Sequence, residues 1–157
     1  MTGDARFEEG REAPLNLGAL EPGDLEVISA LAQDAVVPVT EIAWRPAERR
    51  FALLLNRFRW EDEGRTRHGP ERVQSVLAFD NVLGVAAQGV TRDAPELILS
   101  LLAVGFQPGT EAPGGQVLLT LAGDGAFRLE VEALEATLRD VTRPYAAPSG
   151  RAPQHRG

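Results

Sequence analysis

The clearest pattern of hydrophobic and polar positions lies at Gly115–Thr142. Gln116–Ala122 is apolar and rich in residues that favour strands, and Ala126–Val131 alternates between apolar and polar side chains. Gly123-Asp124-Gly125 separates them and supplies residues that tolerate a positive φ, as a tight hairpin turn requires. This pattern predicts two antiparallel strands joined by a short turn.

After this hairpin the period of the pattern changes from about two to about 3.6 residues. The apolar positions of one helical stripe are Val131, Leu134, Leu138 and Val141. We therefore expect a C-terminal amphipathic helix that caps the sheet, with Glu132 and Glu135 on its solvated side. Glu135 and Arg139 are four residues apart and would form an ion pair on that helix.

The earlier part of the chain predicts one helix followed by strands. Glu21-Pro22-Gly23-Asp24 has the proline and acidic residues that favour a helix start. The predicted strands are Val36–Arg45, Arg49–Trp60, Arg72–Asp80 and Val82–Val90. Arg49–Trp60 is apolar on both faces in its first half, which predicts a strand that is central or sharply bent there. Glu96–Leu102 fits a helix or a strand, whereas Ala103–Phe106 favours a strand.

These elements add up to an N-terminal helix, about seven strands and a C-terminal capping helix, without helical crossovers between the strands. We therefore expect an α+β fold, an antiparallel small barrel or curled sheet with the element order of the pleckstrin-homology-like barrel. A chain of 157 residues should form one domain, which we place at residues 15–142. Residues 1–14 are expected to be a flexible N-terminal arm and residues 143–157 a disordered tail.

Charge and composition exclude several function classes. The net charge of −7 disfavours nucleic acid and anionic membranes as partners, because both need a positive field. No apolar run is long enough for a membrane span, and Met1–Pro14 lacks the apolar region of a signal peptide, so we expect a cytoplasmic protein. The chain has no cysteine and no lysine, which excludes thiol nucleophiles, Cys-ligated metals and lysine Schiff bases.

No residue pattern indicates catalysis. His68 and His155 are the only histidines, in a polar loop and in the tail, and neither has a partner at fixed spacing for metal ligation or proton transfer. Ser29, Ser75 and Ser100 lack the flanking glycines of a nucleophile elbow, and no glycine-rich phosphate loop occurs. We expect no catalytic residues, no metal site and no cofactor.

The sharpest feature is an arginine cluster, since half of the arginines lie between Arg45 and Arg72. The candidate binding residues are Arg45, Arg49, Arg50, Arg57, Arg59 and Trp60. The alternative is a solvated strand whose arginines pair with Glu61–Glu63. Within N-R-F-R-W-E, arginines and aromatics alternate between the two faces, and core aromatics with outward arginines are the plainer interpretation.

Four segments together resemble the alphaproteobacterial domain-of-unknown-function family 2948. They are E-P-G-D-L-E-V-I-S-A-L-A-Q-D-A-V, E-R-R-F-A-L-L-L-N-R-F-R-W-E, L-L-A-V-G-F-Q-P-G and F-R-L-E-V-E-A-L-E-A-T-L-R-D. The resemblance covers roughly Leu15–Val141. It implies a small soluble bacterial protein and brings no catalytic residues with it.

Three hypotheses of function follow. The first is a non-enzymatic interaction module that binds a protein partner through the Arg-rich strand edge. The second is a binder of a small anionic molecule, or an unrecognised enzyme, that uses the mouth of the barrel. The third is a homo-oligomer whose strand edges pair, with Val36–Arg45 and Val82–Val90 as the candidate edges.

Overall fold

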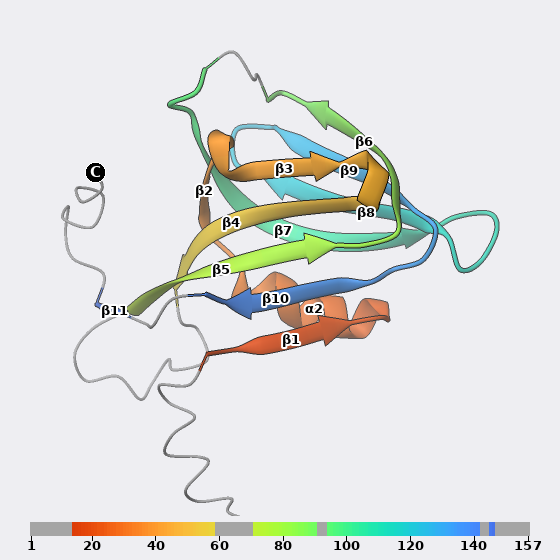
Figure 1. Ribbon diagram of the computed structural model, residues 1–157, viewed down its shortest axis with the longest axis horizontal. Coiled ribbons are helices and arrows are strands. Elements are labelled where there is room, and N and C mark those ends of the chain that lie inside the picture. The colour runs from red at the N-terminus through yellow and green to blue at the C-terminus, as the bar shows by residue number, and fades with distance from the viewer. Residues whose placement is uncertain (1–13, 59–70, 91–93, 142–144, 147–157) are drawn as a thin grey trace, which may run out of the picture.

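The chain forms one antiparallel sheet of eleven strands in the computed structural model, which describes residues 14–58, 71–90, 94–141 and 145–146 (Figure 1). The strands are β1 (Asn16–Ala19), β2 (Val36–Pro38), β3 (Ile42–Arg45), β4 (Arg50–Phe58), β5 (Glu71–Phe79), β6 (Val82–Gln88), β7 (Ile98–Pro108), β8 (Gly115–Leu121), β9 (Ala126–Val131), β10 (Ala136–Asp140) and β11 (Tyr145–Ala146). The described helices are α2 (Pro22–Leu31) and two short 3-10 helices, η1 (Val39–Glu41) and η2 (Pro46–Glu48).

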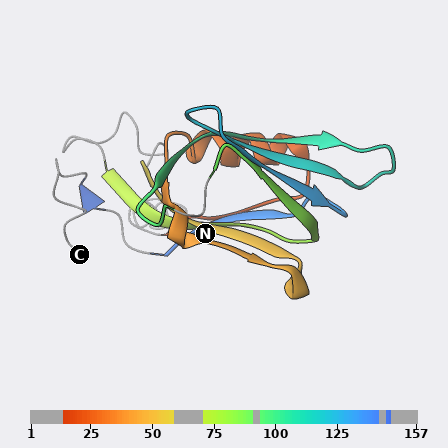
Figure 2. The ribbon, with the colours of Figure 1, turned by 90° about the horizontal axis from the view of Figure 1, so that it is seen from above.

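The strand order is β1-β10-β5-β4-β2-β7-β8-β9-β6, with β3 paired to β4 and β11 paired to β5. The sheet curls so that the orange-to-yellow hairpin of β3 and β4 lies in one layer and the blue-green strands β7 to β9 lie in the other (Figure 2). The end strands β1 and β6 do not pair with each other in the described part of the chain, so the sheet is not closed. The expected barrel of about seven strands, and with it the pleckstrin-homology-like fold, is therefore wrong.

The C-terminal capping helix does not form. The chain bends at Glu132 and Ala133 and continues as β10, which pairs with β1 on one side and β5 on the other. Leu138 lies directly between Leu17 and Leu77, so its burial comes from pairing on both sides. These contacts between distant segments override the local helix preference.

Two predictions from the alternating pattern are confirmed. Strands β8 and β9 form the expected hairpin, and its turn places Gly123 at a φ of 83° and Asp124 at 70°. Strand β4 is central, because it pairs with β5 along one edge and with β2 and β3 along the other. The helix predicted after Glu21 also forms, as α2, with Leu25 and Ile28 buried.

Two other segments differ from their expected form. Val36–Arg45 is not one strand, because the 3-10 helix η1 separates β2 from β3. The ambiguous segment after Glu96 becomes β7, with a bulge between Leu101 and Ala103. The bulge places Leu101 and Val104 on the same buried side, three residues apart, which imitates the spacing of a helical stripe.

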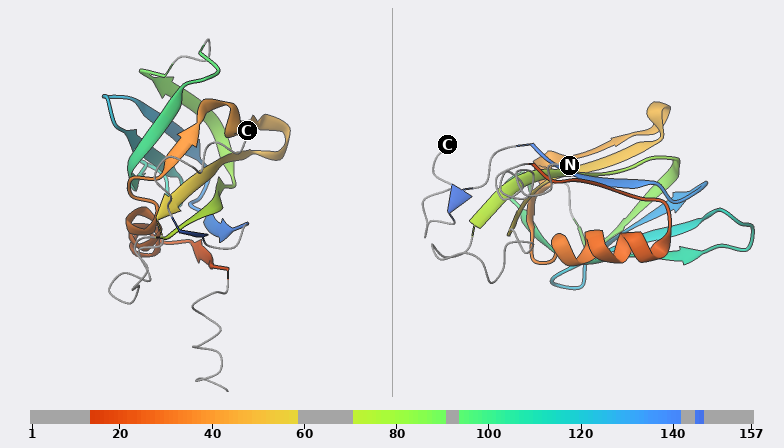
Figure 3. Two further views of the ribbon diagram at one scale, coloured as in Figure 1. Left: turned by 90° about the vertical axis from the view of Figure 1, so that its left-hand side faces the viewer. Right: turned by 90° about the horizontal axis from the view of Figure 1, so that it is seen from below.

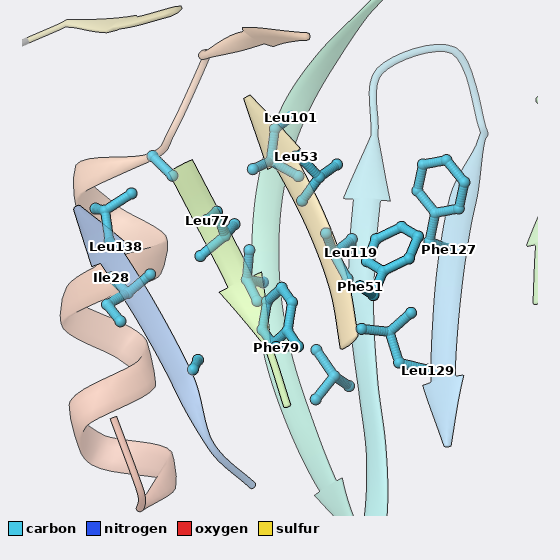
Figure 4. Close-up of a cluster of buried hydrophobic side chains, with 14 of the residues drawn as sticks. Ile28, Phe51, Leu53, Leu77, Phe79, Leu101, Leu119, Phe127, Leu129 and Leu138 are labelled. Carbon is cyan, nitrogen blue, oxygen red and sulfur yellow. The ribbon is translucent and has the colours of Figure 1, made fainter. Parts of the chain in front are cut away.

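The core lies between the two layers of the sheet. Phe51 and Phe127 come from opposite layers and meet with ring centroids 5.4 Å apart, surrounded by leucines from β4, β5, β7, β8 and β9 (Figure 4). Helix α2 closes one side of the sheet, where it packs against β7, β1 and β10 (Figure 3). Ile28 points from α2 into this core, and Ser29 Oγ accepts a hydrogen bond of 2.9 Å from the Val104 amide.

Several predicted segments lie outside the described residues. These are most of the arm at 1–14, nearly all of the polar loop around His68, at Glu61–Glu71, and most of the tail at 143–157. Within the tail, Tyr145 and Ala146 form β11 and pair with Arg72 and Glu71 of β5. In the part of the chain that the structure describes, no helix has the length and hydropathy of a membrane span.

Candidate functional site

A buried polar cluster joins the central strands. Arg57 follows Phe51, Leu53 and Leu55 on the inward face of β4, and all four side chains are buried. Ser75 occupies an inward position on the neighbouring strand β5, and Asp140 an inward position at the end of β10. Strand alternation therefore brings one arginine, one hydroxyl and one carboxylate into the interior at the same end of the sheet.

The three side chains are bonded to one another. Arg57 Nη2 donates to Asp140 Oδ1 at 3.0 Å, and Arg57 Nε donates to Ser75 Oγ at 3.0 Å. Ser75 Oγ donates in turn to Asp140 Oδ1 at 2.7 Å. Both charged side chains of the pair have no exposed surface. An ion pair so far from water must be held by hydrogen bonds to both partners.

Backbone groups complete the cluster. Asp140 Oδ2 accepts a hydrogen bond of 2.9 Å from the Leu15 amide, and Arg57 Nη1 donates to the Phe58 carbonyl at 3.1 Å. The cluster thus links β4, β5 and β10 with the residue that precedes β1. Among these described residues the arginine and the carboxylate balance in charge and the polar groups bond to each other, so the cluster ties the strands together. Arg57 cannot act as the surface binding residue that the sequence suggested.

The expected arrangement of N-R-F-R-W-E is also wrong at Arg57 and Phe58, the arginine and the aromatic of this motif that the structure describes. Arg57 is the inward side chain, whereas Phe58 lies on the outer face, half-buried under Arg72 with the guanidinium carbon 4.1 Å from the ring centroid. Arg72 Nε also donates to Asn56 Oδ1 at 2.7 Å. Arg59, Trp60 and His68 lie outside the described residues, and Trp44 packs half-buried against the core.

Three arginines of the cluster, Arg45, Arg49 and Arg50, lie around the turn of the β3–β4 hairpin, and each has a carboxylate partner. Arg49 Nη1 is 2.9 Å from Glu132 Oε1, and Arg50 Nη1 is 3.1 Å from Asp80 Oδ1. Arg45 Nη1 approaches Glu48 Oε2 less closely, at 3.9 Å. The expected partners Glu61–Glu63 lie outside the described residues, and the carboxylates found here are Glu48, Asp80 and Glu132 instead.

These ion pairs should differ in their contribution to stability. The Arg50 and Asp80 side chains are 40% and 28% exposed, whereas Arg45 and Glu48 are 64% and 60% exposed. We expect Arg50→Ala to lower the free energy of unfolding by about 0.5–1 kcal/mol, and Arg45→Ala to change it by about 0.2 kcal/mol or less. Urea denaturation of the two variants measures this difference, and equal losses would contradict it.

Strand β6 presents an open edge. Within the described part of the chain it pairs with β9 alone, although the Val82 amide at its start donates to the Arg49 carbonyl at 2.9 Å. Its sequence V-L-G-V-A-A-Q has no charge and no proline, the two features that commonly prevent pairing at an edge. Ala86, Ala87 and Gln88 are exposed, and Leu83 is 51% exposed. Among the described strands this edge is therefore unpaired, and its own sequence does not protect it.

Comparison with known protein families gives one match. Residues 15–155 match the model of a family described as "Protein of unknown function (DUF2948)". The chain belongs to the DUF2948 family. No curated protein and no solved structure matches it significantly. The DUF2948 match spans every strand from β1 to β11, so the buried cluster and the open β6 edge both lie within the family domain.

Sequence reasoning missed two members of the buried cluster of this DUF2948 domain, although signals for them were present. The signal for Ser75 is its alternation with Val73, Leu77 and Phe79 along β5, and all four side chains are buried. Asp140 was missed because its segment read as a helix. Among the described residues, no group of three or more His, Asp and Glu side chains is placed to hold a metal ion.

Proposed function

We propose that this DUF2948 protein is a non-enzymatic interaction module that binds a polypeptide partner by strand addition at β6. The observation that carries the proposal is the unpaired, uncharged edge of β6, whose residues Ala86 to Gln88 are exposed. Strand addition uses such an edge, since backbone hydrogen bonds supply affinity and the side chains on either face supply specificity. On the composition of the sequence alone, we propose the cytoplasm as its compartment.

The other surfaces give less support to a function. A partner or small anion at the β3–β4 turn would have to displace the carboxylates that already pair with Arg45, Arg49 and Arg50. Catalysis at the buried cluster would require access to Arg57 and Asp140, whose side chains have no exposed surface. The Val36–Arg45 edge is less suitable. Strand β2 already pairs with β4 and β7, and among the described strands β3 pairs with β4 alone, so only β3 keeps an unpaired edge there.

Placing a lysine at the centre of the edge should abolish binding. We expect Ala86→Lys to reduce recovery of bound polypeptide by at least about tenfold, because an edge charge has to be desolvated when a strand pairs there. The chain or its variant is immobilised, and the amount of polypeptide that binds to it is measured. The polypeptides tested include untagged copies of the chain itself. Thr120→Lys on the internal strand β8 adds the same charge to the same outer face and should retain binding.

A third variant, with Arg45, Arg49 and Arg50 all changed to Ala, tests the arginine surface in the same assay. Loss of the partner from this variant, with retention by Ala86→Lys, would move the contact to the hairpin and overturn the β6 proposal. Equal recovery by all variants and wild type would overturn it as well. Circular dichroism and thermal unfolding verify that each variant is folded.

A further inference from the structure

The register of β6 on β9 places two opposite charges on neighbouring rows of the outer face. Gly84 lies opposite Glu130, and Ala86 lies opposite Arg128. Arg128 is exposed and has no ion-pair partner among the described residues, whereas Glu130 Oε1 accepts a hydrogen bond of 3.2 Å from Gln116 Nε2. Because Gly84 and Ala86 are small, the long side chains of Arg128 and Glu130 have an open path across β6 to its free edge.

We propose that the polypeptide bound at β6 is a second copy of this chain, paired antiparallel about a two-fold axis at Val85. This inference rests on the proposed function, since it uses the same open edge. Such an axis places Ala86 opposite Gly84 of the second copy, and Gly84 opposite its Ala86. A line drawn across the paired sheets from Arg128 of one copy therefore passes through Ala86 of that copy and then Gly84 of the other copy, and ends at the Glu130 of that other copy. The same line-up occurs on both sides of the axis.

The distance across this row fits an ion pair. Arg128 and Glu130 of the second copy are three interstrand spacings apart, about 14 Å between Cα atoms. Fully extended arginine and glutamate side chains that lie flat across the two β6 strands together reach about 12 Å, which leaves roughly a hydrogen-bond distance between their charged ends.

Electrostatics selects this register over its neighbours. An axis at Gly84 would continue the Glu130 row into the Glu130 row of the second copy, and an axis at Ala86 would do the same for Arg128. Both registers bring like charges together across the interface, which is unfavourable. Strand β6 adds no charge of its own to the interface, since Val82–Gln88 contains no charged residue.

Charge reversal with mixing tests the inference. We expect wild type to dimerise reversibly in sedimentation velocity over a concentration series. Arg128→Glu or Glu130→Arg alone should raise the dimer dissociation constant at least about tenfold, because each creates two like-charge contacts. An equimolar mixture of these two variants should return to within about threefold of wild type, because each heterodimer then contains two attractive pairs. The double variant Arg128→Glu with Glu130→Arg should recover likewise.

Arg139→Glu supplies the matched control, because Arg139 is an exposed arginine on β10, far along the sheet from β6. It should leave the dimer unchanged. A wild-type dimer that neither the single reversals nor Ala86→Lys weakens would place the interface elsewhere and overturn the inference. A monomer at every concentration would also overturn it. In either case, the effect of Ala86→Lys on the binding of other polypeptides decides the proposed function. If this substitution abolishes that binding, the proposed function stands and only the dimer inference fails. If it does not, the proposed function and the dimer inference both fail.

Discussion

Asp140→Ala should be among the most destabilising single substitutions in this chain, with an expected loss of about 3–5 kcal/mol in the free energy of unfolding. The substitution removes the carboxylate that pairs with the Arg57 guanidinium in the interior, and removing one member of a buried ion pair is strongly unfavourable. It also removes the acceptor for the Leu15 amide and for the Ser75 hydroxyl. Urea denaturation monitored by circular dichroism gives the difference in the free energy of unfolding, provided that the dependence of this free energy on urea concentration is the same in both proteins.

A double variant separates the charge from the packing. We expect Arg57→Met combined with Asp140→Leu to be less destabilising than Asp140→Ala alone, because replacing both members of a buried pair with apolar groups removes the desolvation cost along with the attraction. Some loss remains, since the Leu15 amide and the Ser75 hydroxyl still lose their acceptor. Glu132→Ala removes the partner of the exposed Arg49 and should lose no more than about 1 kcal/mol. If Asp140→Ala were as mild as Glu132→Ala, the cluster would be hydrated and its structural role disproved.

The sequence predicted the strands whose alternation is uninterrupted. Phe127, Leu129 and Val131 alternate with Ala126, Arg128 and Glu130, and this period needs no information from the rest of the chain. In β10 the buried positions are Ala136, Leu138 and Asp140. A small residue and a carboxylate flank the only large apolar side chain of the three, so the hydrophobic pattern does not show the alternation of a strand. The spacing of Leu134, Leu138 and Val141 suggested a helix instead.

The same error concealed the buried cluster. Alternation in β4 already placed Arg57 on the face of Phe51, Leu53 and Leu55, but an arginine on a core face demands a buried partner. That partner is 83 positions away in a segment interpreted as a helix, so no local pattern could supply it. The open edge of β6 depends in turn on strand order, which is a property of the whole sheet. Charge and composition pointed to the arginines, but the carboxylates that pair with Arg49, Arg50 and Arg57 come from distant strands and turns, which no local pattern predicts.

Gly115→Ala should produce the second large effect, a loss of about 2–3 kcal/mol in the free energy of unfolding. Gly115 begins β8 and lies opposite Pro108 of β7 and Val131 of β9. A Cβ atom at this position would lie 2.6 Å from the Phe106 ring and would also collide with the Gln107 carbonyl oxygen. Because Phe106 packs against the core and the carbonyl belongs to the backbone, neither can move without disturbing the hairpin.

Gly105→Ala in the same hairpin is the matched control for this steric argument. A Cβ atom at Gly105 would meet nothing within 4 Å, so alanine should be neutral there or stabilise the strand by about 0.5 kcal/mol through the reduced freedom of the unfolded chain. Urea denaturation of both variants therefore isolates the close approach at Gly115 from the general effect of replacing glycine. Similar stabilities for the two variants would mean that β7 and β8 separate enough to admit a methyl group, and that the packing of Phe106 over Gly115 does not hold the hairpin together.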